Sequence, residues 1–148
     1  MTITLEPAAP EDAESLADLR LLAMRESLER LHRFDPQRAR QRLLGNFAAE
    51  HTRHVVAEGK RVGLVVVRPC EEGLLLDHLY IHPDHQRKGI GAAVMARVFA
   101  EADLQEKRLR VGALKESESN AFYLRHGFRL VEQAEWDNYY VRDVGRGR

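Results

Sequence analysis

The residues with the clearest chemical potential form the segment 86–91, which reads Gln-Arg-Lys-Gly-Ile-Gly. Gly89 and Gly91 lack a Cβ, so a ligand can approach their backbone amides closely. The segment follows an apolar run and a proline and leads into a helix-like stretch, whose first N–H groups lack intrahelical partners. These donors, the positive end of the helix dipole and the cationic side chains of Arg87 and Lys88 favour an anion. A pyrophosphate is the natural ligand of such a loop.

The spacing of this loop excludes two common nucleotide motifs. A Walker loop requires Gly, four residues and then Gly-Lys-Ser/Thr, whereas here Lys88 precedes Gly89. A dinucleotide fingerprint requires a third Gly or Ala three residues after Gly91, where this chain has Val94. The remaining pattern, Gln/Arg-x-x-Gly-x-Gly/Ala, resembles the coenzyme A pyrophosphate loop of the GCN5-related N-acetyltransferase (GNAT) family.

The flanking residues strengthen this resemblance. Residues 79–85, Leu-Tyr-Ile-His-Pro-Asp-His, resemble the strand end and Pro turn that precede the family's loop, and residues 92–102 resemble its helix. Residues 120–128, Asn-Ala-Phe-Tyr-Leu-Arg-His-Gly-Phe, are similar to the family's second signature, an aromatic pair followed by Gly-Phe. The resemblance is specific between residues 73 and 128, and it departs from the pattern at Glu116, where the family often has Asn.

The resemblance implies that acetyl-coenzyme A is the co-substrate and that the backbone binds most of it. The N–H and C=O groups at the end of the strand would pair with the pantetheine arm as a missing strand would. Arg125 would either reach the phosphates or complement the dipole at the end of its own helix. The implied binding residues are Leu79, Tyr80, Ile81, Gln86, Arg87, Lys88, Gly89, Ile90, Gly91, Ala92 and Arg125.

The resemblance also implies direct attack of an amine on the thioester. Tyr123 matches the family's tyrosine that protonates or hydrogen-bonds the departing thiolate, and a phenol is protonated at neutral pH. Asp77 and His78 lie where many relatives carry a group that accepts the amine proton, directly or through water. Successive strand residues face opposite sides, so only one of them can face the cleft, and Asp77 is slightly favoured. His78, His82 and His85 lack a cysteine or paired carboxylate to complete a zinc site, so no metal is expected.

Hydrophobic periodicity and turn residues predict the elements that position these groups. Helices are expected at about 11–31, from Asp35 through residue 47, at 92–102 and at 117–126, where Gly127 ends the helix. Strands are expected at 3–6, 54–57, 62–68, 74–81, 109–113, 128–131 and 139–144, the last completing the sheet. The predicted fold is a single-domain α/β fold over residues 1–148, with a flexible tail at 145–148. Its sheet is mixed and mostly antiparallel, with six or seven strands, helices on both faces and a V-shaped cofactor cleft between the parallel strands 74–81 and 109–113.

Composition is typical of a compact intracellular enzyme. The 23 basic and 23 acidic residues cancel, so charge gives no indication of nucleic acid or of a membrane as partner. No segment approaches the ~20 apolar residues that span a bilayer, and the cytoplasm is the expected location. Cys70 is the single cysteine and cannot form an internal disulfide.

The sequence leaves other functions and the acceptor open. A non-catalytic acyl-coenzyme A sensor would keep the glycine loop without needing proton transfer, and a nucleotide-binding regulatory domain is weakened by the failed motifs. The expected acceptor is a small-molecule or peptide amine whose identity the sequence does not give, and the protein could form a homodimer. Seven arginines between Arg20 and Arg42, against Glu26, Glu29 and Asp35, indicate either an anionic acceptor or a solvated helix face.

Overall fold

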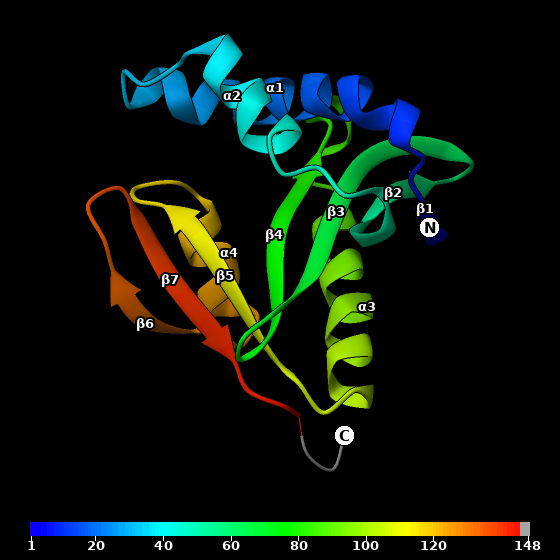
Figure 1. Ribbon diagram of the computed structural model, residues 1–148, viewed down its shortest axis with the longest axis vertical. Helices are drawn as coiled ribbons and strands as arrows, with labels where there is room; N and C mark the ends of the chain where they lie inside the picture. Colours follow the sequence, from blue (N-terminus) through cyan, green and yellow to red (C-terminus); the bar gives the residue numbers. More distant parts are fainter. Residues whose placement is uncertain (146–148) are drawn as a thin grey trace. The chain divides into compact units, whose positions relative to one another are not determined.

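The computed structural model of the protein describes residues 1–145, which form one seven-stranded sheet in the order β1-β2-β3-β4-β5-β7-β6 (Figure 1). The strands are β1 (Ile3–Pro7), β2 (Thr52–Ala57), β3 (Lys60–Cys70), β4 (Gly73–Ile81), β5 (Arg108–Leu114), β6 (Arg129–Gln133) and β7 (Asp137–Arg142). The α-helices are α1 (Ala13–Arg30), α2 (Pro36–Leu44), α3 (Ile90–Leu104) and α4 (Ser119–Arg125). β4 and β5 pair in parallel, whereas β1–β2, β2–β3, β5–β7 and β6–β7 are antiparallel. The predicted α/β class with a mixed, mostly antiparallel sheet is confirmed.

The described chain divides into two compact units. Unit 1 comprises residues 1–66 and 78–94, and unit 2 comprises residues 67–77 and 95–145. β3, β4 and α3 each begin in one unit and end in the other. The predicted flexible tail 145–148 lies outside the described residues except for Gly145, whose N–H donates to Asp103 Oδ1 at 2.8 Å.

The core of unit 1 joins its two long helices to its sheet. Asp35 caps α2 by accepting the Arg38 N–H at 3.2 Å, and Pro36 occupies the first helical turn, as predicted. The helices α1 and α2 lie side by side in Figure 1. Their apolar faces and the inner residues of β3 form one buried cluster, which consists of Leu16, Ala17, Leu43, Leu64 and Val66. Burial of these side chains is the main force that holds both helices against the strands.

A buried histidine ties the start of α1 to β2 within unit 1. His54 is 3% exposed, and its Nε2 lies 2.9 Å from Asp12 Oδ2, which also accepts the Ala9 N–H at 2.9 Å. These contacts lower the pKa of the Asp12 carboxyl, first through the Ala9 N–H and then through His54. Ionised Asp12 therefore fixes the entry to α1.

Unit 2 places α4 against the strands that follow α3. Leu109, Val111 and Ala113 alternate as buried residues along β5, the pattern of a strand with one face covered. Gly127 ends α4 with φ +91°, so the predicted left-handed closing residue is present. Phe128 then packs on Phe99 of α3, with ring centroids 5.7 Å apart.

Several predicted boundaries differ from the structure, among them the end of α2, which lies at Leu44 rather than at residue 47. α4 begins at Ser119 rather than at residue 117, because the Ser117 N–H bonds the Leu114 carbonyl in a turn. The last strand lies at 137–142 rather than 139–144, and it occupies the position between β5 and β6. The edge of the sheet on that side is therefore β6, all five of whose residues are exposed.

Candidate active site

The predicted anion loop lies between β4 and α3 in unit 1. The Pro83–His85 turn begins with His82, whose Nδ1 accepts the Asp84 N–H at 3.1 Å. The chain then turns through Arg87 and Gly89, which have φ of 65° and 79°, before α3 begins at Ile90. Gly89 therefore supplies the left-handed conformation for which glycine is best suited.

The loop has the shape and donors of an anion cradle. The first intrahelical bond of α3 runs from the Ala93 N–H to the Gly89 carbonyl at 3.1 Å, so the N–H groups of Ile90, Gly91 and Ala92 precede it. The first turn of α3 contains no acidic residue. A Cβ placed on Gly89 would have nothing within 4 Å, and residues 86–89 are exposed while Ile90 is 2% exposed. Ile90 thus anchors the helix start and leaves open space above the loop, which fits a pyrophosphate.

Gln86 has a structural partner as well as a predicted ligand. Its Nε2 donates to the Ile81 carbonyl at 3.0 Å, which links the loop to the end of β4. Arg87 and Lys88 are exposed. The two cationic side chains therefore face solvent at the mouth of the cradle.

The end of β4 has one edge directed to β3. The Tyr80 carbonyl oxygen would lie 2.4 Å from a Cβ at Gly63, and the His82 N–H donates to the Val62 carbonyl at 2.7 Å. Because backbone polar groups of consecutive strand residues alternate in direction, those of Leu79 and Ile81 face the other edge. Within the described residues, β4 pairs with β5 from Gly73–Arg108 to Leu76–Val111. The pairing therefore ends before Leu79.

The two predicted proton acceptors have different partners. Asp77 Oδ2 lies 3.1 Å from Arg68 Nε, and the Asp77 side chain is 8% exposed. His78 is 3% exposed, with its Nε2 3.2 Å from Arg42 Nη1 and its Nδ1 3.1 Å from Tyr80 Oη. Asp77 is thus held in an ion pair, whereas His78 belongs to a hydrogen-bonded group that includes α2.

This group extends to α1 through a residue that the sequence did not single out. Arg20 is 8% exposed, donates from Nε to Tyr80 Oη at 3.0 Å, and donates from Nη1 to the Ala39 carbonyl at 2.7 Å. We call Arg20, Arg42, His78 and Tyr80 the arginine–tyrosine cluster. All four lie in unit 1. The arginine excess of the first two helices was the sequence signal for Arg20 and Arg42, whereas His78 and Tyr80 were predicted individually as site residues.

Tyr123 lies in unit 2 on the inner side of α4. It is 7% exposed, and its ring centroid lies 5.3 Å from that of Phe128 and 6.1 Å from that of Tyr140. Arg125 is exposed in the last turn of the same helix. The packing fixes the position of the Tyr123 ring.

A hydrogen-bond network centred on Asn120 holds the start of α4. Asn120 Nδ2 donates to the carbonyls of Leu114 and Ser117 at 3.0 and 2.9 Å, and its Oδ1 accepts from Asn138 Nδ2 at 2.9 Å and Tyr140 Oη at 2.7 Å. The network joins β5, α4 and β7. Glu116 has φ 67° in the preceding turn, a conformation in which asparagine is enriched.

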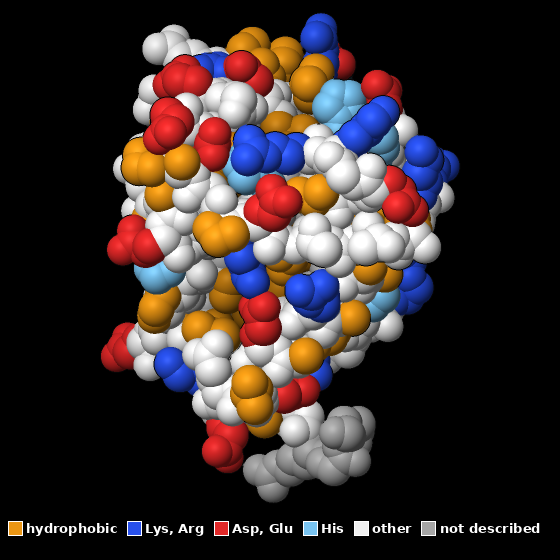
Figure 2. All heavy atoms as spheres, turned by 90° about the vertical axis from the view of Figure 1, so that its right-hand side faces the viewer, with side chains coloured by type: hydrophobic (Ala, Val, Ile, Leu, Met, Phe, Trp, Pro, Cys, Tyr) orange, Lys and Arg blue, Asp and Glu red, His pale blue; other side chains and the backbone are white. Residues whose placement is uncertain are grey.

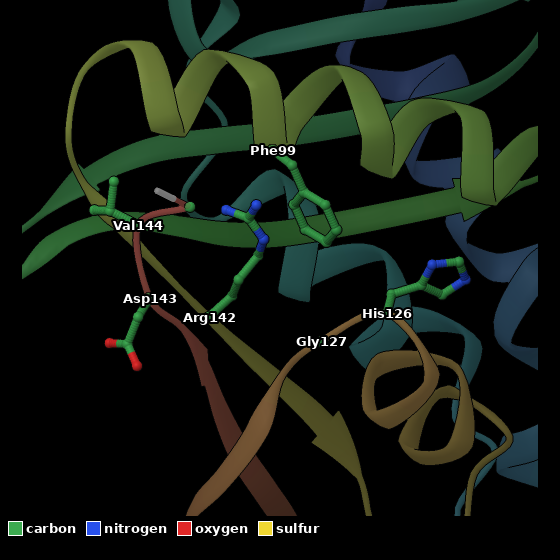
Figure 3. Close-up of a pocket in the computed structure, with 7 residues that line it drawn as sticks. Phe99, His126, Gly127, Arg142, Asp143 and Val144 are labelled. Atoms are coloured by element: carbon green, nitrogen blue, oxygen red, sulfur yellow. The ribbon is translucent and has the colours of Figure 1, made fainter. Parts of the chain in front are cut away.

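A pocket of about 500 Å³ lies in unit 2, and none of the predicted site residues lines it (Figure 3). Arg142 points toward Phe99 in this view, with its Cζ 4.1 Å from the ring centroid, and bonds both Asp103 carboxylate oxygens at 2.9 and 3.1 Å. Asp143 points away and pairs with Arg108 and Arg129. Arg142 and Asp143 of this pocket are therefore both held in ion pairs with other residues of unit 2.

The described residues offer neither a metal site nor a membrane-spanning helix. Within residues 1–145, no three His, Cys, Asp or Glu side chains are grouped so that they could hold a metal ion. None of the helices in the same range is long and apolar enough to cross a bilayer.

Comparison with known proteins defines the class. The profile of the acetyltransferase (GNAT) domain matches residues 50–130, more than half of the chain. This match defines the class of the protein as an acetyltransferase that uses coenzyme A. The chain belongs to the GNAT family, and acetyl-coenzyme A is its co-substrate. The resemblance drawn from the loop and the second signature is confirmed.

Solved structures agree over nearly the whole chain. The PaiA N-acetyltransferase of Thermoplasma acidophilum, in complex with coenzyme A, is 14% identical with a TM-score of 0.79, covering 97% of this chain and 99% of its own. An acetyltransferase from Thermus thermophilus is 23% identical with a TM-score of 0.77, covering 97% and 98%. The N-acetylglutamate synthase of Neisseria gonorrhoeae, complexed with coenzyme A and N-acetyl-glutamate, is 14% identical with a TM-score of 0.68, covering 99% and 36%. No curated protein matches the sequence.

Proposed function

We propose that the protein transfers the acetyl group of acetyl-coenzyme A to a primary amine by direct attack. The observation that carries this proposal is the β4–loop–α3 cradle, with its exposed glycine loop and the N–H groups that begin the helix, in a chain of the GNAT family. The fold alone would not suffice, because one fold hosts many functions.

The chain's own groups account for binding of the co-substrate. Residues 86–92 hold the pyrophosphate through backbone N–H groups, and Arg87, Lys88 and Arg125 add positive charge for the phosphates. Leu79 and Ile81 pair with the pantetheine arm along the edge of β4 that faces away from β3. The Tyr80 carbonyl faces Gly63 of β3. The backbone of Tyr80 therefore does not bind the pantetheine arm directly, and Tyr80 contributes only by holding Leu79 and Ile81 in place.

The chemistry requires removal of one proton and delivery of another. The amine loses a proton and its nitrogen attacks the thioester carbonyl, and the C–S bond then breaks as the electron pair leaves with sulfur. Tyr123 donates a proton or hydrogen bond to that thiolate. Asp77 or His78 accepts the amine proton, directly or through water. His78 Nε2 already accepts from Arg42, which can only donate, so His78 would take the amine proton only after it gives up that hydrogen bond.

Mass spectrometry tests the proposed transfer. The protein is incubated with isotope-labelled acetyl-coenzyme A and an extract of metabolites and peptides, and acetylated amines are identified by the label. Labelled N-acetyl products that are absent from the Tyr123→Phe reaction support the proposal. Tight binding of acetyl-coenzyme A with no labelled amine would favour a non-catalytic acyl-coenzyme A sensor, which the ion pair of Asp77 with Arg68 also permits.

Charge and location complete the proposed function. Formal net charge is zero, and Figure 2 shows basic and acidic side chains interspersed over the face that it presents. This pattern supports a small-molecule or peptide acceptor rather than nucleic acid, which attracts proteins through a continuous basic surface. We place the reaction in the cytoplasm, where acetyl-coenzyme A is available.

A further inference from the structure

We propose that the acceptor amine carries a carboxylate and that the arginine–tyrosine cluster binds it. The proposal deepens the proposed acetyl transfer and rests on it. It assigns an anion-binding role to Arg20 and Tyr80, on the side of β4 that contacts α1 and α2. The substrate class is a small amino acid or a similar amine with a free carboxylate.

The first observation is a buried positive charge that the protein does not neutralise. Arg20 is 8% exposed, and its acceptors are the Tyr80 hydroxyl and the Ala39 carbonyl, both of which are neutral. Within residues 1–145, no carboxylate forms an ion pair with Arg20. Removal of a guanidinium from water is costly unless an opposite charge compensates it. A substrate anion would supply that charge.

Two other arginines of the same helices are neutralised by carboxylates of the protein itself. Arg40 contacts the carboxylates of both Glu14 and Asp18, and Arg25 pairs with Glu29 at 3.2 Å. Arg40 is therefore compensated from α1 although it is more exposed than Arg20. Arg20, the buried arginine of these helices, instead has the neutral partners Tyr80 and Ala39.

The second observation concerns the direction of the Tyr80 hydroxyl proton. Arg42 can only donate, so His78 Nε2 accepts, and the proton of the neutral imidazole lies on Nδ1 and is donated to Tyr80 Oη. Arg20 Nε can also only donate to the same oxygen. Tyr80 Oη thus accepts two hydrogen bonds, and its own proton is available to a third group. An acceptor-only group such as a carboxylate matches that proton.

The third observation is that the cluster reaches solvent. Arg20 and His78 are buried, Tyr80 is half-buried and Arg42 of α2 is exposed, so solvent exposure within the cluster is greatest at Arg42. An anion that enters from this side meets Arg42 first, and then the Tyr80 hydroxyl and the Arg20 guanidinium. The two guanidinium groups can only donate, and the Tyr80 hydroxyl has its own proton left to donate, which is the requirement for carboxylate recognition.

The position of Tyr80 connects this site to the proposed reaction. Tyr80 lies between Leu79 and Ile81, whose backbone groups we assign to the pantetheine arm, while its side chain contacts α1. A carboxylate held by the hydroxyl would therefore lie one strand residue from the backbone that binds the co-substrate. A compact amine is the acceptor that this spacing favours.

Acetylation of matched acids and amides tests the inference. Amino acids and their α-carboxamides share the reacting amine and differ in the anion, and kcat/KM is measured for both with a coenzyme A release assay. We expect the wild type to prefer the acid. Tyr80→Phe and Arg20→Gln should each lower the ratio of acid to amide kcat/KM by about 10- to 100-fold, the loss typical of a hydrogen bond to a charged group. Tyr80→Phe retains the ring and keeps the test valid if Arg20→Gln fails to fold.

Arg25→Gln is the matched control, because it removes an exposed arginine of the same helix and should leave the ratio unchanged. Equal acetylation of acids and amides by the wild type, or an unchanged ratio in Tyr80→Phe and Arg20→Gln, would overturn the carboxylate site while the acetyl transfer stands. Failure to acetylate any amine, with acetyl-coenzyme A still bound, would instead overturn the proposed function.

Discussion

At the scale of single residues, Tyr123 separates an enzyme from a binding module. Its ring is fixed by Phe128 and Tyr140, so Tyr123→Phe removes the hydroxyl and retains the packing. If the phenol assists departure of the thiolate, kcat should fall by about 10²-fold while the affinity for acetyl-coenzyme A changes little. Stopped-assay kinetics with an identified acceptor and calorimetry with acetyl-coenzyme A measure the two quantities.

A second tyrosine provides the control for this prediction. Tyr139 of β7 packs on Gly112, with its Cε1 3.0 Å from where a Cβ would lie, and no role in transfer is assigned to it. Tyr139→Phe should retain wild-type turnover. Near-wild-type kcat in Tyr123→Phe would remove this residue from the mechanism and leave protonation of sulfur to solvent.

The proton acceptor is also a question of single residues. If removal of the amine proton limits the rate, kcat/KM should rise with pH, and only the variant that lacks the true base should lose this rise. Asp77→Asn breaks the ion pair with Arg68, whereas His78→Ala removes the acceptor of Arg42. We expect the pH profile to flatten in one of them. Retention of the rise in both would assign proton removal to water or to the ionisation of the amine itself.

At the scale of elements, the β4–α3 loop should carry affinity for the co-substrate. Gly89→Ala places a methyl group in open space with φ +79°, so it strains the backbone by about 1 kcal/mol and fills part of the cradle. We expect weaker binding of acetyl-coenzyme A by calorimetry, with still greater loss in Gly89→Asp, which adds a like charge.

The β2–β3 turn offers a matched glycine. Gly59 has φ +80° and also has nothing within 4 Å of its added Cβ. Gly59→Ala should therefore cost the same stability in thermal unfolding and leave the affinity unchanged. Equal affinities of the two alanine variants would contradict the assignment of the loop.

At the scale of the whole molecule, acid sensitivity should depend on Asp12. Its pKa is lowered below the ordinary value of 3.8, so its ionised form stabilises the fold above that pH, and this stabilisation is lost as the pH falls through the folded pKa. Asp12→Asn should lower the Tm at neutral pH, and the difference from the wild type should shrink in acid. Thermal unfolding followed by circular dichroism at a series of pH values measures both.

Glu11→Gln serves as the control, because Glu11 is an exposed neighbour on the same turn. A wild-type advantage over Asp12→Asn that stays constant as the pH falls well below 3.8 would show that the carboxylate charge is not what holds the start of α1.

Residues whose role is local were predictable from the sequence, whereas long-range partners were not. Gly127 is identified by the positive φ that glycine adopts readily, and Asp35 by a side chain that can accept the N–H of Arg38 three residues later. Both requirements are local, so the residue type is enough to predict them. Arg20 and Tyr80 lie 60 residues apart, and no periodic pattern reports such a pair. The loop was recognisable because its chemistry depends on backbone, whose requirements are few. The order of the strands in the sheet could not be predicted in the same way, because alternation of apolar and polar residues identifies a strand but not the strands with which it pairs.

The position of β7 also has a consequence in time. All registered pairs of β6 are with β7, and β7 lies between β5 and β6 although it comes last in the chain. During synthesis, residues 129–133 leave the ribosome before residues 137–142 and have no strand beside them until those residues emerge. Loss of residues 137–142 by premature termination would therefore remove two strands from the sheet, because β6 would lose its neighbour as well. Incorporation of β6 into the sheet therefore depends on the later synthesis of β7.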